Sequence, residues 1–158
     1  MSDLKEPSES NCFYADHVSI LRMSFKRLTG NELVPLELSE QEAARFLFDA
    51  PFAVVSHNTD ADPIFNYANK KAMRLFEMEW DKLTKLPSRI SAEPVNRNER
   101  SRLLNEVSEH GYINNYSGIR ISSSGKRFRI SNAVVWNLIS ADGEPAGQAA
   151  MFSDWEFV

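Results

Sequence analysis

Two neighbouring side chains, Ser56 and His57, carry the groups of a nucleophile and a general base. Ser56 ends the apolar segment 52–56, which favours a strand, and His57 follows it, before a polar turn. Adjacent side chains of a strand point to opposite faces of its sheet, so these two should diverge. No glycine-flanked nucleophile elbow surrounds Ser56. We therefore favour a role in satisfying turn backbone groups, with hydrogen bonding at a pocket mouth as the alternative.

Two arginines, Arg89 and Arg120, are candidates for binding a carboxylate. Arg89 lies in a proline-bounded loop, and Arg120 lies on a predicted strand, where Tyr116 shares its face at i−4. A guanidinium on a sheet, opposite one on a loop, could hold a carboxylate with paired hydrogen bonds. The favoured alternative is that both arginines are solvated or pair with acids such as Glu93 or Asp154.

Asn69 and Trp136 each have a structural interpretation and a ligand-binding one. Asn69 precedes an apolar helical segment, so it is expected to cap that helix. Its side chain would also end a strand on the concave side of the sheet, where it could contact a ligand. Trp136 alternates with Val134 and Leu138 along the longest predicted strand. Core packing is the default for such an aromatic residue, and lining a pocket is the alternative.

Two helices are predicted before the first strand. The first covers residues 12–29 and ends at Gly30, a suitable C-terminal cap. The second begins with the capping box of Ser39 and Glu42 and stops near Asp49, before a proline. The first helix carries an apolar stripe at spacings of four and three, formed by Tyr14, Val18, Leu21, Phe25 and Leu28. Either the chain's own sheet or a second chain must cover this stripe.

The remaining elements alternate strands with a group of helices. Asn96 is the expected cap of the last helix, and Gly111 is its expected terminator. Gly-containing turns at 123–125 and 141–144 separate three consecutive strands, a pattern typical of a β-meander. In chain order we predict strands at 52–56 and 64–67, helices at 69–76, from 81 and 96–109, and strands at 115–122, 126–139 and 146–155.

Composition narrows the class of protein. A chain of 158 residues indicates one domain. A net charge of -4 argues against nucleic-acid binding, which needs a basic surface. The one cysteine, Cys12, excludes an internal disulfide. The polar N-terminus lacks an apolar signal core, and no run of roughly 18 apolar residues suggests a membrane helix. We expect a cytoplasmic protein that contacts neither nucleic acid nor membrane.

This order of elements resembles the PAS arrangement, in which two strands, a helical cluster and a three-stranded meander form one antiparallel sheet. Tyr67-Ala68-Asn69 is similar to the end of the second PAS strand, and Asp142-Gly143 with Ser153-Asp154 is similar to the last hairpin. The expected fold is α+β, a PAS-like five-stranded antiparallel sheet with helices on one face and an N-terminal helical extension.

A narrower resemblance covers nearly all of residues 14–155. It includes Asp62-Pro63-Ile64-Phe65-Asn66-Tyr67-Ala68-Asn69, Pro87-Ser88-Arg89, Asn115-Tyr116-Ser117-Gly118-Ile119-Arg120 and Val134-Val135-Trp136-Asn137. On these segments the chain is identified as a stand-alone member of the MEKHLA-domain family, which is PAS-related. That domain also forms the C-terminal part of class III homeodomain-leucine zipper proteins of plants. With the PAS-like core that the resemblance implies at 51–158, the residues themselves predict a disordered tail at 1–11 and a helical extension at 12–50.

The resemblance implies a sensory or interaction module and supplies no catalytic residues to transfer. We expect no enzyme, but a domain that binds an unknown small molecule, a protein partner or both, and signals in trans. A small enzyme using Ser56 and His57, or a purely structural adaptor, are the alternatives. A homodimer through the first helix is a further expectation. The proposed ligand-binding residues are Ser56, His57, Asn69, Arg89, Tyr116, Arg120 and Trp136.

The resemblance to PAS domains also raises the question of a chromophore, and we expect neither haem nor flavin. His17 and His110 look isolated, which argues against an axial haem ligand. The light-oxygen-voltage subfamily needs a cysteine in an asparagine-cysteine-arginine-phenylalanine motif. Asn11-Cys12-Phe13 has only a superficial likeness to it and precedes the first helix.

Overall fold

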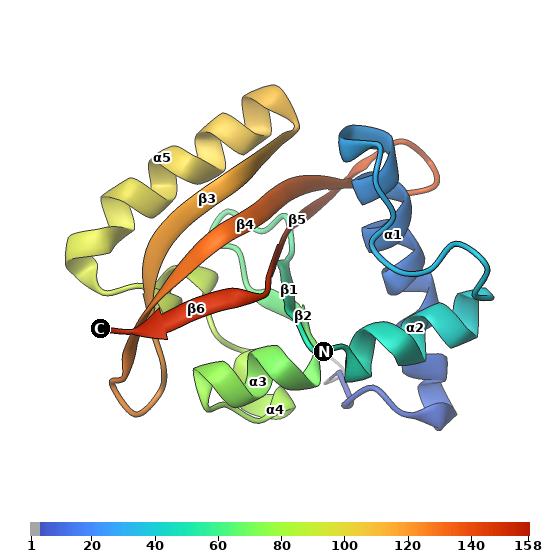
Figure 1. Cartoon of the computed structure of the whole chain (residues 1–158), viewed down its shortest axis with the longest axis horizontal. Coiled ribbons are helices and arrows are strands. Elements are labelled where there is room, and N and C mark those ends of the chain that lie inside the picture. The colour runs from blue at the N-terminus through green and yellow to red at the C-terminus, as the bar shows by residue number, and fades with distance from the viewer. Residues whose placement is uncertain (1–3) are drawn as a thin grey trace.

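An antiparallel sheet of six strands forms the centre of the protein (Figure 1), whose computed structural model describes residues 4–158. Five strands lie in the order β2-β1-β5-β4-β3, and β6 also pairs with β4. The strands are β1 (Ala53–His57), β2 (Phe65–Ala68), β3 (Tyr112–Ile121), β4 (Arg127–Ile139), β5 (Pro145–Phe152) and β6 (Asp154–Phe157). The predicted PAS-like sheet is confirmed, with one strand more than expected.

The extra strand arises because the predicted third strand of the meander, residues 146–155, breaks at Ser153. β5 pairs with β1 and with the second half of β4, whereas β6 pairs with the first half of β4. β4 bends at the same level, at Asn132, where φ is +55°. Asn132 Nδ2 donates a hydrogen bond to Asp154 Oδ2 (3.1 Å). The bulge in β4 therefore lies beside the break in its partner.

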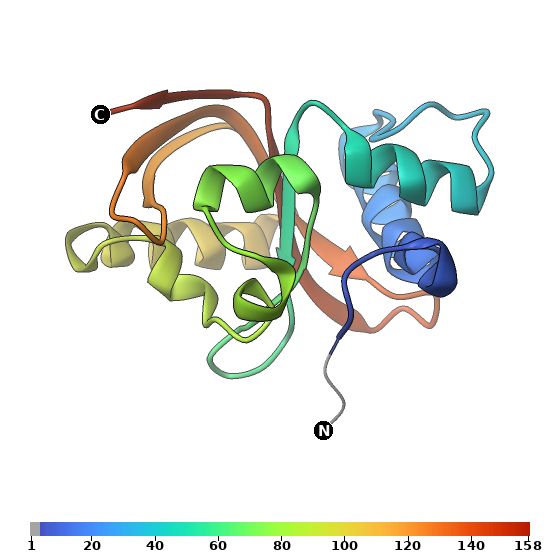
Figure 2. The ribbon, with the colours of Figure 1, turned by 90° about the horizontal axis from the view of Figure 1, so that it is seen from below.

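Helices lie on both sides of the sheet (Figure 2). One side carries α3 (Lys70–Phe76), α4 (Trp80–Leu83), the 3-10 helix η2 (Ser88–Ser91) and α5 (Pro94–His110). The other side carries α1 (Ala15–Thr29) and α2 (Glu40–Asp49), which follow the 3-10 segment η1 (Glu9–Tyr14). The N-terminal extension therefore covers the face that the core helices leave free. No helix within residues 4–158 has the length and apolarity needed to cross a bilayer.

The apolar stripe of α1 packs on the chain's own sheet. Leu21 is fully buried, and its carbonyl accepts a hydrogen bond from Trp136 Nε1 (3.3 Å) on β4. The rings of Phe25 and Trp136 meet edge to face with centroids 5.0 Å apart. Ser24 Oγ accepts a hydrogen bond from the Ile139 backbone N–H (3.0 Å). Because the sheet covers this stripe, it is not free to form the homodimer that we expected.

The N-terminal boundaries differ slightly from the prediction. α1 begins at Ala15 and not at residue 12, because Cys12, Phe13 and Tyr14 have φ values of +55°, +52° and +56°, outside the helical region. Within residues 4–11, assigned above to a tail, Leu4 O accepts a hydrogen bond from Trp80 Nε1 (3.2 Å). The capping box of α2 forms as predicted.

The start of α5 needs a larger correction. Asn96 is not its cap; the helix begins two residues earlier, at Pro94, whose fixed φ suits the first helical position. Arg100 then shares the buried face of α5 with Leu103 and Val107. At its C-terminal end, Gly111 has φ +94° and its N–H bonds to Val107 O (2.8 Å), as predicted.

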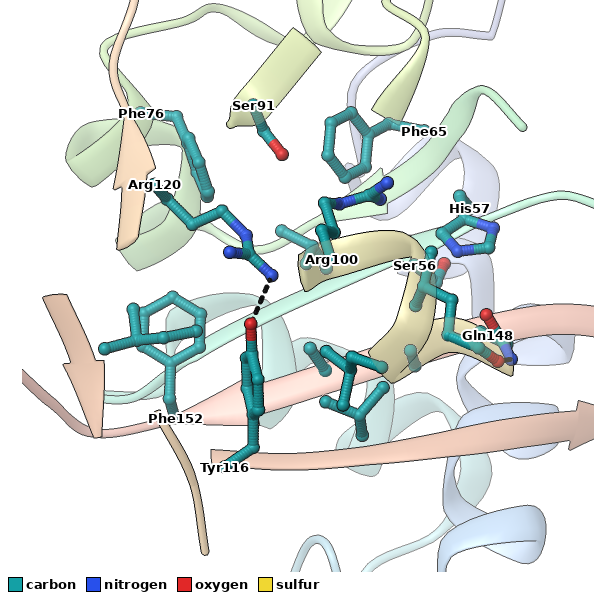
Figure 3. A pocket seen from close by; sticks show the side chains of 17 residues that line it. Ser56, His57, Phe65, Phe76, Ser91, Arg100, Tyr116, Arg120, Gln148 and Phe152 are labelled. Atoms are coloured by element: carbon teal, nitrogen blue, oxygen red, sulfur yellow. Dashed lines mark hydrogen bonds between the residues drawn. The ribbon is translucent and has the colours of Figure 1, made fainter. Parts of the chain in front are cut away.

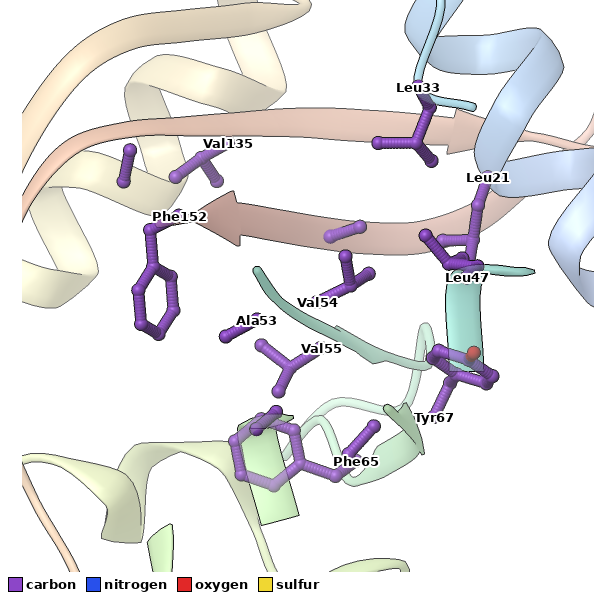
Figure 4. Close-up of a cluster of buried hydrophobic side chains, with 14 of the residues drawn as sticks. Leu21, Leu33, Leu47, Ala53, Val54, Val55, Phe65, Tyr67, Val135 and Phe152 are labelled. Atoms are coloured by element: carbon purple, nitrogen blue, oxygen red, sulfur yellow. The ribbon is translucent and has the colours of Figure 1, made fainter. Parts of the chain in front are cut away.

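β1 contributes side chains to two halves of the core. Figure 4 shows Val54 and Val55 on opposite sides of this strand, with Leu21 and Leu47 on the Val54 side. Both valines are buried. This alternation continues to the end of the strand, where it governs the directions of Ser56 and His57.

Candidate ligand pocket between the sheet and α5

A cavity of about 60 Å³ lies between the inner face of the sheet and the helices η2 and α5. Aromatic and aliphatic side chains, such as Phe65, Phe76, Leu103 and Phe152, form most of its wall. Polar side chains from five different elements interrupt this wall (Figure 3). They are His57, Ser91, Arg100, Tyr116, Arg120 and Gln148; Ser56 also borders the cavity, but its hydroxyl bonds to Asn66 and to His17 of α1.

Arg120 and Tyr116 come together as their predicted shared face requires. Arg120 Nη2 donates to the Tyr116 hydroxyl (3.1 Å), and Arg120 Nη1 donates to Ile119 O (2.9 Å). The guanidinium also lies over the Tyr116 ring, 5.6 Å from its centroid. The Tyr116 hydroxyl in turn donates to Glu99 Oε2 (3.0 Å). Both side chains line the cavity and are buried.

The second arginine of the cavity is Arg100, which the sequence analysis missed. It is only 8% exposed and donates one hydrogen bond, from Nη2 to Ser88 Oγ (2.8 Å). Burial first, and the charge of Arg120 second, lower the pKa of Arg100 to about 10. The signal that could have found Arg100 is helical spacing, because it lies three and seven residues before Leu103 and Val107.

Neither of these buried arginines has an acidic partner in contact. Among residues 4–158, no carboxylate lines the cavity, and neither Arg100 nor Arg120 forms an ion pair. Glu99, which contacts the Tyr116 hydroxyl, is itself exposed. The two guanidiniums donate three hydrogen bonds in all, although each carries five N–H donors. A buried charge without a partner is energetically unfavourable.

His57 and Gln148 provide hydrogen-bond acceptors. His57 Nδ1 lies 3.0 Å from Asn58 O, so Nδ1 carries the proton and Nε2 presents a lone pair. Nε2 is buried and has no hydrogen-bond partner within the described chain. Burial lowers the pKa of His57, which keeps the ring neutral. Gln148 Nε2 donates to Leu104 O, Ser108 Oγ and Asn137 Oδ1, whereas Oε1 accepts no hydrogen bond from residues 4–158.

Ser56 turns away from His57, as the strand geometry predicts. Its hydroxyl donates to Asn66 Oδ1 (2.5 Å) and lies 2.9 Å from Nε2 of His17, on α1. Since the serine proton is used by Asn66, His17 Nε2 is the donor to Ser56 Oγ and not a base acting on it. Sequence spacing could not reveal this contact, because His17 and Ser56 are 39 residues apart.

The other three proposed ligand-binding residues lie outside the cavity. Asn69 is fully buried and caps α3. Arg89 is half exposed and pairs with Asp62 (Nε to Oδ1, 3.1 Å), so it forms no clamp with Arg120 and pairs with an acid, which is the alternative that we favoured. Trp136 lies on the opposite face of the sheet, against α1. For Trp136 the core-packing interpretation is therefore the correct one.

Buried His17 should make stability depend on pH. Burial lowers the pKa of His17 from 6.5 to about 4, so between these values the unfolded chain binds more protons than the folded chain. Stability is then fully present above pH 6.5 and is lost as the pH falls towards 4, by roughly 3 kcal/mol. We expect His17→Gln to flatten this dependence in denaturant titrations, whereas His110→Gln, at an exposed site, should not. Equal slopes for wild type and His17→Gln would contradict the assignment.

Comparison with known structures shows that the fold is that of PAS domains. The PAS domain of a protein from Colwellia psychrerythraea has a TM-score of 0.60 and 13% identity, covering 73% of this chain and 92% of that one. An RNA-binding light-oxygen-voltage receptor has a TM-score of 0.61 and 17% identity, covering 77% of this chain and 34% of that one. At these identities the likeness concerns the fold alone.

The family follows from a more specific match. The MEKHLA domain model matches residues 15–157, and the chain belongs to this family. Homeobox-leucine zipper protein HOX32 of Oryza sativa subsp. indica is 21% identical over 136 residues, 85% of this chain and 16% of that protein. ATHB-14 of Arabidopsis thaliana is 27% identical over 106 residues, 65% of this chain and 12% of that protein. The chain thus spans a small part of these relatives. It is a PAS-like sensory domain, a fold that is typically non-enzymatic.

One structurally similar protein is a light-oxygen-voltage domain studied with a flavin analogue, but the described side chains of this chain do not fit a flavin. A cavity of about 60 Å³ has room for roughly four to six water molecules at ~10–15 Å³ each, which is far too little for a tricyclic ring. Cys12 is exposed and lies beside Gln41, outside the cavity.

Proposed function

We propose that this domain is a non-enzymatic sensor that binds a small molecule in the cavity beside α5 and passes the signal to a protein partner. The observation that carries the proposal is the set of polar groups that the chain leaves without partners. Buried polar groups in folded proteins nearly always have hydrogen-bond partners. His57, whose Nε2 has no partner in the described chain, and the two arginines without an acidic partner line one cavity, and a bound molecule would supply what they lack.

The same geometry argues against an enzyme that uses Ser56 and His57. The two side chains lie on opposite faces of β1, and the serine proton is held by Asn66. A base must reach the proton that it removes, and His57 does not reach Ser56 Oγ. The neutral His57 and the two arginines offer binding groups without a convergent acid and base.

A path for the signal runs through β1. His57 lines the cavity, and its neighbour Ser56 contacts His17 of α1 on the other face of the sheet. A ligand that shifts the end of β1 would therefore also shift the contact with α1. We propose α1 and α2 as the part of the domain that responds, with the partner reading their position.

A structural adaptor is the second candidate, because the cavity is small. A substitution that fills the cavity should distinguish a sensor from a structural adaptor. In Ala150→Leu a larger side chain would project from the inner face of β5, whereas Ala141→Leu adds the same atoms in an exposed turn. Native mass spectrometry and thermal unfolding of the purified protein with a panel of small metabolites would be the measurements.

A sensor should retain or bind a small molecule in the wild type and in Ala141→Leu, but not in Ala150→Leu. A ligand at a hundred times its Kd should stabilise the protein by about 2.7 kcal/mol, or roughly 5–10 °C in a chain of this size. If no molecule binds and Ala150→Leu is more stable than the wild type, the cavity is an unfilled core and the adaptor is correct.

A further inference from the structure

We infer that the ligand is a short hydroxycarboxylic acid, with its carboxylate between Arg100 and Arg120 and its hydroxyl towards His57. The inference rests on the proposed function, since it specifies the molecule that the same cavity takes. Three observations support it. The cavity wall carries two positive charges, the rest of the wall is mostly apolar, and His57 and Gln148 offer hydrogen-bond acceptors.

The charge of the wall selects an anion. Arg100 comes from α5 and Arg120 from β3, and both line the cavity; in Figure 3 the Arg120 guanidinium points to Tyr116, and that of Arg100 lies on the side of Phe65 and His57. No carboxylate lines the cavity in the described part of the chain. The arginines repel each other, which contributes to the lowered pKa of Arg100. A bound anion would offset both charges and use N–H donors that the chain leaves free.

The remaining wall selects a carboxylate over an inorganic oxyanion. Phe65, Phe76, Leu103 and Phe152 surround the arginines with apolar surface, and phosphate would face that surface with unpaired oxygens. A carboxylate presents two coplanar oxygens that match a guanidinium fork, and it carries a carbon chain that can contact the apolar wall. The volume of about 60 Å³ limits that chain to a few carbons.

The acceptors select a ligand that also donates a hydrogen bond. His57 Nε2 has no partner, and Gln148 Oε1 also accepts nothing from the described residues. His57 and Arg100 line the same small cavity, so one small molecule could reach both groups. A hydroxyl supplies the missing proton without adding charge, and a plain fatty acid would leave these acceptors unsatisfied.

The test is calorimetric titration of the full chain with lactate and with three matched probes. Propionate lacks the hydroxyl, lactamide lacks the charge, and inorganic phosphate lacks the carbon chain. We expect lactate to bind, propionate to bind roughly tenfold more weakly, and lactamide and phosphate not to bind detectably. Arg100→Gln and Arg120→Gln should each weaken lactate binding by roughly 10- to 100-fold. Arg89→Gln, which removes an exposed arginine outside the cavity, should leave it unchanged.

The unliganded melting temperature distinguishes a binding role from a structural one. Removing an unpaired buried charge should leave the melting temperature of Arg100→Gln at or above that of wild type. If Arg100→Gln unfolds, the fold itself needs the guanidinium and the inference is overturned. Equal affinity for lactamide, or for phosphate, also overturns it. If these probes do not bind while a neutral molecule co-purifies, the proposal of a carboxylate ligand is wrong but the proposal of a sensor stands. If nothing binds and Ala150→Leu is more stable than the wild type, both proposals are wrong.

Discussion

Gly147→Ala is expected to lower the free energy of unfolding by about 3–5 kcal/mol, in the upper tail of single substitutions. A Cβ at this position would lie 1.9 Å from the carbonyl oxygen of His57 and 3.1 Å from its carbonyl carbon. Both atoms belong to the backbone of β1, which cannot rotate away as a side chain can. Gly147 also has φ +120°, a conformation that side chains disfavour. Denaturant titration measures the loss.

Gly143→Ala is the matched control for the close approach. Gly143 has φ +83°, but nothing lies within 4 Å of an added Cβ. The variant should therefore lose only about 1 kcal/mol of the free energy of unfolding, because alanine disfavours this positive φ. Should the two variants lose the same stability, β1 and β5 would not approach each other as closely as the structure describes. Because the clash is with His57, Gly147→Ala should also disturb the end of the cavity.

Asn69→Ala should lower the free energy of unfolding by about 3–5 kcal/mol, because it leaves buried polar groups of the backbone without hydrogen-bond partners. Asn69 Oδ1 accepts from the backbone N–H groups of Val54 and Ala72, both at 3.1 Å. Its Nδ2 donates to Leu47 O (3.0 Å) and Phe52 O (2.7 Å). One side chain thus joins α2, β1 and the first turn of α3.

Asn96→Ala is the control for this second prediction. The sequence also suggests Asn96 as a helix cap, but it lies inside α5 and its side chain caps nothing. We expect a change within about 0.5 kcal/mol, as for a surface substitution. Thermal unfolding followed by circular dichroism would compare the two variants. A loss of less than 1 kcal/mol for Asn69→Ala would show that water or backbone relaxation replaces its hydrogen bonds.

Local signals accounted for much of the fold. Turn glycines, the capping box at Ser39 and the cap at Asn69 act over a few residues, and each forms as predicted. The pairing of Tyr116 with Arg120 was also within reach, because residues of a strand two or four apart share a face. These interactions depend on short spacings that the sequence displays directly.

Alternation could not say which face of β4 lies inside. Trp136 does share a face with Val134 and Leu138, but that face meets α1 instead of the cavity. The bulge at Asn132 also shifts the register. Ile130 and Val135 both line the cavity, although residues five apart in a regular strand would face opposite sides of the sheet. A single residue in the left-handed region reversed the pattern, and no turn motif announced it.

The arginine that faces Arg120 was misassigned for a related reason. Arg89 lies in the short 3-10 helix η2, whose direction is set by tertiary contacts, such as the hydrogen bond from Ser88 N to Pro63 O (2.8 Å). Arg100 lies on a helix, where direction follows from spacing once the start of the helix is known. The predicted helix 96–109 already contained Arg100, which was missed because an arginine is not expected on the buried face of a helix.

The packing of α1 on β4 also has a consequence during synthesis. Trp136 and Leu21, which join the two elements, are 115 residues apart. A ribosome adds roughly 5–20 residues per second, so α1 waits about 6–23 s before β4 has been made. Throughout that interval the face of α1 that packs on β4 lacks that strand as a cover. The nascent chain must therefore hold an exposed apolar helix near the ribosome, which makes it a substrate for chaperones that bind such segments.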